Sequence, residues 1–171
     1  MHTFTLNFST TVSAERLWLA LTDPKYTTKW DGNRWASNDA RVGGKMRART
    51  EDGILSEAEI LQYEPCSRLA VLPTLFNNPE EPEDGTFLAR MEFTLDPQKE
   101  KTQLAMKVTG FPDEAKAAMM KNSWGGFYLE KIAKVAESIP AKEVEQFLHS
   151  LEEHNDFPGH VRHTEIATII R

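Results

Sequence analysis

The spacing of the apolar residues changes along the chain, and this change most limits the folds that are open to it. Residues 3–8 alternate strictly between apolar and polar, which is the pattern of a half-buried strand. The same two-residue period returns between about residues 33 and 110, interrupted by turn signals. From residue 117 to residue 139, apolar residues recur every three or four positions, which predicts a helix. Strands with short turns followed by one long helix predict an α+β domain whose antiparallel sheet curves around that helix.

Two short helices are predicted between the first strand and the rest of the sheet. Ser13 can cap the first, and Glu15 lies in its first turn, where the helix dipole favours a negative charge. Pro24 ends this helix, because the residue before a proline avoids the helical conformation. A second helical turn is predicted for residues 25–29, just before Trp30.

Glycine and proline divide the predicted sheet into strands. Gly43 and Gly44 separate two strands, and Asp52-Gly53 predicts a hairpin turn. Residues 64–67 form a further predicted turn, and residues 77–85 form a polar loop that is rich in proline and carboxylates. On either side of the Asp52-Gly53 turn, one set of alternating residues is Met46, Ala48 and Thr50, and the other is Ser56, Ala58 and Ile60. The last two predicted strands supply two inward rows, which are Phe87, Ala89, Met91, Phe93 and Leu95, and then Leu104, Met106 and Val108.

The predicted long helix contains a glycine pair, Gly125-Gly126. Each glycine costs about 1 kcal/mol relative to alanine in a helix. The helix therefore bends at this pair, or it begins near Ser123. The missing side chains would let a ligand or a strand approach the helix backbone, or they simply relieve crowding against a curved sheet.

Residues 1–139 are predicted to form the domain, and residues 140–171 to form a C-terminal extension. Pro140 ends the long helix, and residues 142–153 predict a short amphipathic helix. Residues 161–171 favour a strand, which could pair with an exposed sheet edge. One role that we expect for the extension is to join two copies of the chain in a homodimer.

The composition argues against some classes of partner and favours one cellular compartment. A chain of 171 residues suits a single domain, and the only cysteine, Cys66, allows no internal disulfide, so we expect a reducing cytoplasm. The N-terminus lacks the pattern of a signal peptide, and no apolar run reaches the ~18 residues of a membrane helix. The net charge of -6 disfavours nucleic acid as a partner.

No cofactor, metal site or catalytic set is predicted. Four of the five histidines lie in the tail, but their spacing matches no metal motif, so we expect a solvated tail there. Cys66 lies in a predicted turn, Ser123 is explained as a helix cap, and no Gly-x-Ser-x-Gly string is present. The acidic residues 80–84 are expected to be solvated, and the alternative is contact with a basic partner.

Several local strings resemble the START-like (SRPBCC) superfamily, and within it the family named after the activator of heat shock protein 90 ATPase. The resemblance covers about residues 4–138 and rests on the order and spacing of the strings together. They are Glu15-Arg16-Leu17-Trp18, Ala20-Leu21-Thr22-Asp23-Pro24, Trp30, Gly43-Gly44, Asp52-Gly53, Glu59-Ile60-Leu61, Glu64-Pro65, Arg68-Leu69, Thr102-Gln103-Leu104, Gly110-Phe111 and residues 124–129.

The resemblance implies a helix-grip fold, with a deep pocket between the concave face of the sheet and the last helix. Members of the superfamily include carriers of hydrophobic ligands, polyketide cyclases and co-chaperone domains, and they share no catalytic residue set. The residues expected to line the pocket are Trp30, Trp35, Met46, Met91, Phe93, Met106, Val108, Met120, Trp124 and Tyr128. Aromatic rings and methionines suit an apolar ligand, although the same pattern is typical of an ordinary packed core.

The leading hypothesis is a non-enzymatic protein that binds a small hydrophobic or amphipathic molecule, such as a lipid or an aromatic metabolite. A second hypothesis is a co-chaperone of heat shock protein 90, although the eukaryotic activator has two domains and this chain has one. A third is an enzyme of the cyclase or dehydratase type, which needs an acid or base aimed into the pocket. Residues 35–39 are the segment that could supply such a group.

Overall fold

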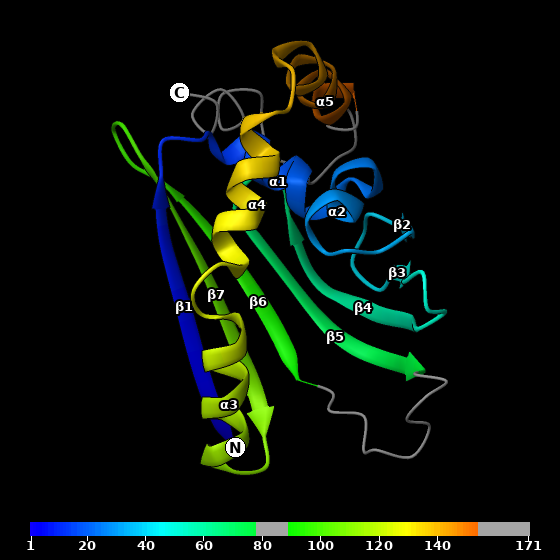
Figure 1. The fold of residues 1–171 in the computed structure, drawn as a ribbon. Helices are drawn as coiled ribbons and strands as arrows, with labels where there is room; N and C mark the ends of the chain where they lie inside the picture. Colours follow the sequence, from blue (N-terminus) through cyan, green and yellow to red (C-terminus); the bar gives the residue numbers. More distant parts are fainter. Residues whose placement is uncertain (78–88, 154–171) are drawn as a thin grey trace.

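The computed structural model describes residues 1–77 and 89–153 of the chain, and within them the strands form one antiparallel sheet. The sheet order is β1-β7-β6-β5-β4-β3-β2, so β2 to β7 form a meander and β1 pairs with the last strand (Figure 1). The strands are β1 (His2–Thr10), β2 (Trp35–Asn38), β3 (Lys45–Arg49), β4 (Leu55–Glu64), β5 (Arg68–Asn77), β6 (Arg90–Pro97) and β7 (Thr102–Phe111). This confirms the predicted fold class.

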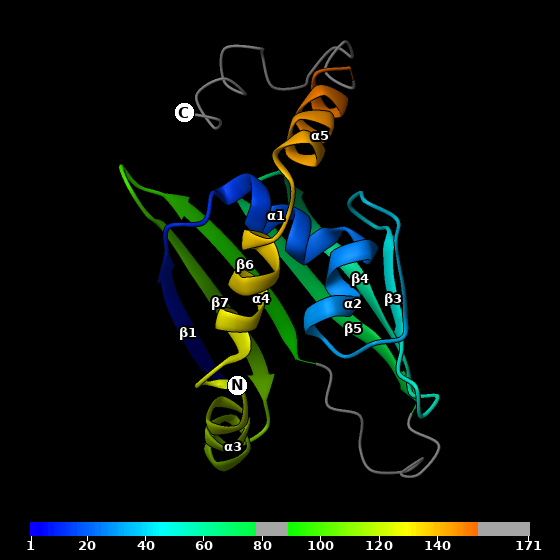
Figure 2. The ribbon, with the colours of Figure 1, turned by 45° about the horizontal axis from the view of Figure 1, so that its top comes forward.

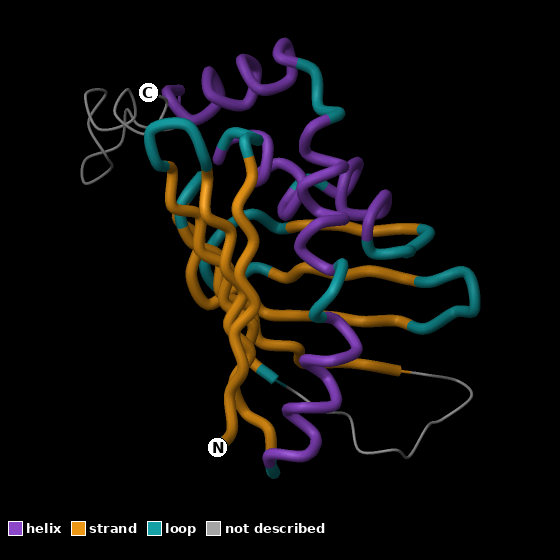
Figure 3. The backbone as a smooth tube through the Cα atoms, turned by 60° about the vertical axis from the view of Figure 1, so that its left-hand side comes forward, coloured by secondary structure: helices purple, strands orange, loops and turns teal. Residues whose placement is uncertain are grey.

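Helices cover one face of the curved sheet, as the tube view shows (Figure 3). They are α1 (Ala14–Thr22), α2 (Pro24–Trp30), α3 (Glu114–Trp124), α4 (Tyr128–Glu137) and α5 (Ala141–Glu153). Helices α1, α2 and α4 lie across the strands, whereas α5 lies beyond the end of α4 (Figure 2). None of these helices is both long enough and apolar enough to cross a bilayer.

Local sequence signals explain where these elements begin and turn. The hydroxyl of Ser13 accepts a hydrogen bond from the Arg16 amide at 3.3 Å and caps α1, as predicted. Asp23 caps α2, and Pro24 occupies its first turn, where a missing N–H costs nothing. Gly53 has a φ of +85° in the turn between β3 and β4, which a residue with a side chain would adopt only with strain.

The apolar stripe predicted for one long helix is divided between α3 and α4. Helix α3 ends at Trp124, and Phe127, with φ -148° and ψ -8°, leaves the helical conformation before α4 begins. A Cβ atom on Gly125 would lie 2.6 Å from the carbonyl oxygen of Lys121. The tight backbone at the end of α3 therefore requires a glycine at this position. Of the two alternatives, a bend at the glycine pair agrees with the break between α3 and α4, and a helix start near Ser123 does not, because α3 begins at Glu114.

Helices α1 and α4 bury more side chains than α3 does. Trp18 of α1 and Ile132 of α4 are fully buried against the sheet, whereas Ala117 is the buried residue of α3. Met120 and Trp124, in the C-terminal half of α3, face an open space between the helices and the sheet. The candidate site lies there.

Helix α5 confirms the predicted amphipathic helix of the extension, and it packs on the domain. Val144 and Phe147 lie against the core cluster. Glu143 accepts a hydrogen bond from the Lys25 ammonium at 2.6 Å and another from the Tyr26 hydroxyl, so α5 is joined to α2. The strand predicted for residues 161–171, three of the tail histidines and the acidic residues 80–84 lie outside the described residues.

Candidate functional site

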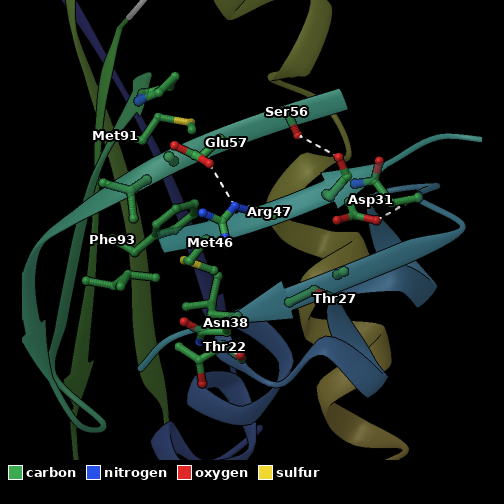
Figure 4. Close-up of a pocket in the computed structure, with 18 of the residues that line it drawn as sticks. Thr22, Thr27, Asp31, Asn38, Met46, Arg47, Ser56, Glu57, Met91 and Phe93 are labelled. Carbon is green, nitrogen blue, oxygen red and sulfur yellow. Dashed lines mark hydrogen bonds and ion pairs between the residues drawn. The ribbon is translucent and has the colours of Figure 1, made fainter. Parts of the chain in front are cut away.

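A cavity of about 460 Å³ lies between the concave face of the sheet and the helices (Figure 4). Small-molecule sites in proteins typically measure roughly 300–1,000 Å³, so this volume is large enough for a ligand. Met46, Met91 and Phe93 come from the sheet, and Trp30 and Met120 face them from α2 and α3. The walls are mainly aromatic rings, methionines and small aliphatic side chains, which favours an apolar occupant.

The cavity brings together most of the residues that were expected to line it. The expected residues that lie in its walls are Trp30, Met46, Met91, Phe93, Val108, Met120, Trp124 and Tyr128. Their shared position follows from two local periods, because alternate strand residues face inward and residues three or four apart share a helix face.

Trp35 and Met106 do not line the cavity. Trp35 is 47% exposed, since the inward positions of β2 belong to Ala36 and Asn38, which pair with Ala48 and Met46 of β3. The expectation that Trp35 lines the cavity is therefore wrong, because successive residues of a strand point to opposite faces of the sheet. Met106 is 0% exposed and belongs to the packed core, where it pairs in register with residues of β1 and β6.

An aromatic group forms the helix side of the cavity. The ring of Tyr128 stacks on Trp124, with centroids 5.1 Å apart, and meets the edge of Trp30 at 5.5 Å. The indole N–H of Trp30 donates to the carbonyl oxygen of Ala20 at 2.7 Å, which fixes the ring. Burial and the nearby charge of Asp31 raise the pKa of Tyr128, so its phenol stays neutral at physiological pH.

Polar groups gather at the end of the cavity where β2 meets α1, and the sequence did not identify them individually. The Asn38 amide nitrogen donates to the carbonyl oxygen of Thr22 at 2.7 Å, and the two residues lie side by side below Met46 (Figure 4). The hydroxyl of Thr22 donates to the Trp18 carbonyl oxygen at 2.7 Å. By contrast, the buried Oδ1 of Asn38 has no hydrogen-bond partner among the described residues.

The charged residues of the described lining are Asp31, Arg47 and Glu57. Arg47 is paired with Glu57 at 2.7 Å, and Lys45 lies 3.2 Å from the same carboxylate. Hydrogen bonds from Arg47 and Lys45 lower the pKa of Glu57, so it is ionised and balances Arg47 at neutral pH. Asp31 lies at an exposed position, and its carboxylate accepts a hydrogen bond from the backbone N–H of Asn33 at 2.8 Å.

Thiol and imidazole groups lie outside the described part of the cavity wall. Within the described part of the chain, the lining contains no cysteine or histidine, and no three metal-binding side chains cluster. Cys66 lies outside the cavity wall and is 2% exposed, and burial raises the pKa of its thiol to about 12, which makes it a poor nucleophile. Ser123 is exposed and also lies outside the lining.

The sequence of the chain matches a known protein family. A sequence model of the family described as "Activator of Hsp90 ATPase homolog 1-like protein" matches residues 11–137. A search of the curated proteins found no match.

Solved structures with low sequence identity share the fold. The protein MLL2253 from Mesorhizobium loti is 23% identical with a TM-score of 0.66, over 81% of this chain and 99% of that one. The Aha1 dimer from Colwellia psychrerythraea is 18% identical with a TM-score of 0.61, over 76% of this chain and 92% of that one. PFC0360w, an HSP90 activator from Plasmodium falciparum, is 18% identical with a TM-score of 0.60, over 79% and 96% of the two chains.

Proposed function

This chain belongs to the Activator of Hsp90 ATPase homolog 1-like family, and within that family we propose that it binds a small hydrophobic or amphipathic molecule without transforming it chemically. The observation that carries the proposal is the 460 Å³ cavity, whose walls are mainly apolar side chains from both the sheet and the helices. An open apolar space of this size costs stability unless something fills it, because its lining loses packing contacts. A ligand that fills it would restore them.

The walls suit such a ligand in shape as well as in polarity. Met46, Met91 and Met120 are flexible and can adapt to an irregular molecule, while the stacked rings of Trp124 and Tyr128 give a fixed flat surface. The neutral phenol and the paired Arg47 leave little uncompensated charge for an apolar molecule to displace. The cytoplasm is the proposed compartment, since the single cysteine is buried and free.

Native mass spectrometry of gently purified protein, combined with extraction of bound compounds, tests this proposal. We expect a discrete added mass that disappears on denaturation and belongs to one class of apolar compound. A clean mass of the protein alone, with no uptake from a library of lipids and aromatic metabolites, would contradict the proposal.

A second candidate is an interaction with a chaperone of the heat shock protein 90 type. It is supported by the description of the family and by the names of the Colwellia and Plasmodium structures, which are an Aha1 dimer and an HSP90 activator. A pull-down with purified chaperone at low salt tests it, and absence of binding there would dispose of it. Homodimer formation through residues 140–171 stays a prediction, and light scattering of the full chain and of a chain cut after residue 140 tests it.

A further inference from the structure

The edge strand β1 lacks the devices that usually prevent a strand from pairing with another chain. It pairs with β7 on one side, and on its other side it faces no strand of the described chain (Figure 1). It is nine residues long and contains no proline, no glycine and no Asp, Glu, Lys or Arg. Its register with β7 shifts only at its start, between His2 and Thr3, so the rest of the strand is regular. Edge strands are normally short, charged or interrupted, because their free N–H and C=O groups otherwise bind a further strand.

The opposite edge of the sheet has these protections. Strand β2 spans only the four residues Trp35–Asn38, and Arg34 and Asp39 flank it. Its neighbour β3 carries Arg47 and Arg49, which are both exposed. A short edge with charges at both ends and beside it is poorly suited to pairing with another strand. Of the two edges of the sheet, β1 is therefore the one that is open to a further strand.

The sequence of β1 is complementary to itself in an antiparallel pair. In a pair related by a two-fold axis at Leu6, Thr5 of one copy lies opposite Asn7 of the other, and Phe4 lies opposite Phe8. Exposed polar residues then meet each other on the outer face, and apolar residues meet on the inner face. Like charges placed directly opposite each other destabilise a strand pair, and this pair has none.

Exposed apolar side chains lie on elements that adjoin β1. Helix α3 packs against β1 and β7, and a Cβ atom on Gly125 would lie 3.7 Å from Cδ2 of Leu6. Met119 of α3 is 62% exposed, and Phe127, at the break after α3, is 51% exposed. Apolar surface is therefore available near this edge as well as the free backbone groups of the strand.

We infer that β1 is the contact surface for a second copy of this chain, in which the two β1 strands pair antiparallel about a two-fold axis and join the two sheets. This interface is independent of any ligand in the cavity, and it differs from a homodimer through residues 140–171. A second copy suits the strand better than the tail does, because residues 161–171 include Arg162, Glu165 and Arg171, whereas β1 is uncharged apart from His2.

A charged pair of substitutions in β1 tests the interface. In Thr5→Glu with Asn7→Glu, each new carboxylate would face another across the two-fold axis, while the Glu at position 5 lies opposite Lys107 of its own chain. Sedimentation velocity of the full chain over a dilution series measures dimer formation. We expect a dimer of the unchanged chain, and a dissociation constant about tenfold higher or more in this variant.

The matched control places the same two charges on the same face of the sheet, but on inner strands. Thr94→Glu with Thr109→Glu does this, because Thr94 of β6 lies opposite Arg68 and Thr109 of β7 lies opposite Arg90. We expect the control to form dimers as the unchanged chain does. Circular dichroism of both variants shows whether they are folded.

Two results of the dilution series would overturn the inference. A monomer throughout the series would remove the second copy altogether. A dimer that the β1 variant weakens no more than the control would place the contact elsewhere, for example in residues 140–171. If the β1 variant does not fold, hydrogen exchange of the unchanged chain decides, because β1 amides should exchange more slowly above the dissociation constant of the dimer than below it. Equal exchange of these amides at both concentrations would contradict pairing through β1.

Discussion

The ring of Trp124, the last residue of α3, stacks on the ring of Tyr128, the first residue of α4, with centroids 5.1 Å apart and planes inclined by 18°. The contact spans the break at residues 125–127. Trp124 also meets Phe4 of β1 edge-on at 6.1 Å, and Tyr128 meets Trp30 of α2. The break thus allows rings from two helices to form one wall of the cavity.

Gly125 should be sensitive to substitution, and its neighbour Gly126 should not. A Cβ atom on Gly125 would lie 2.6 Å from a backbone oxygen, whereas a Cβ atom on Gly126 would meet nothing within 4 Å. We expect Gly125→Ala to lower the free energy of unfolding by more than about 1 kcal/mol, and Gly126→Ala to leave it unchanged or raise it by up to about 1 kcal/mol. Urea denaturation of both variants measures this. Equal effects would show that the break does not depend on Gly125.

Helix α5 should be released when Glu143 is removed. This carboxylate accepts hydrogen bonds from Lys25 and Tyr26 of α2, while Glu145 on the same helix is exposed. In Glu143→Ala we expect faster amide hydrogen exchange in α5 and unchanged exchange in the strands of the sheet. Glu145→Ala is the matched control and should exchange like the unchanged protein. Unaltered protection of α5 in Glu143→Ala would mean that Val144 and Phe147 hold the helix alone.

The same contact should make α5 sensitive to pH at both extremes. The hydrogen bond from Lys25 lowers the pKa of Glu143 below its ordinary 4.5, so the stabilisation is present above that pH and is lost as pH falls through the lowered value. The bond to Glu143 raises the pKa of Lys25 above its ordinary 10.5, so its contribution is present below that pH and is lost at more alkaline pH. Protection of the α5 amides, taken as their exchange rate relative to an unfolded peptide at the same pH, should therefore be greatest between these limits. A profile that does not differ from that of Glu143→Ala would contradict the contact.

Cys66 should resist alkylation in the folded protein. It is 2% exposed, and a thiol with a pKa of about 12 instead of the ordinary 9.0 carries about a thousandfold less thiolate at pH 8. We expect no iodoacetamide adduct on the native chain over an hour and complete reaction in denaturant, which intact mass reports cleanly because the chain has one cysteine. Rapid native labelling would show that the turn at residues 64–67 opens.

The sequence was most informative where structure depends on neighbouring residues. Caps such as Ser13 and turns such as Gly53 act over a few positions, and alternation along strands placed Met91 and Phe93 in the cavity wall correctly. It was less informative where one element depends on another. Whether Met106 lies in the packed core or in the cavity wall is set by how the helices pack on the sheet. The hydrogen bond of the Asn38 side chain depends on Thr22, which lies on a different element. The four-residue strand at Trp35 was too short for its phase to be assigned.

A pair of variants in the sheet tests most directly whether the apolar cavity takes up a ligand. Met91→Glu places a charge in the cavity wall, whereas Thr5→Glu places the same charge at an exposed position of β1, opposite Lys107. Titration with the neutral dye Nile red, on variants whose circular dichroism matches the unchanged protein, measures binding. We predict at least tenfold weaker binding in Met91→Glu and unchanged binding in Thr5→Glu, because a carboxylate in the wall would have to be buried beside the dye. Unchanged affinity in a folded Met91→Glu would show that the dye binds elsewhere and would contradict ligand uptake by the cavity.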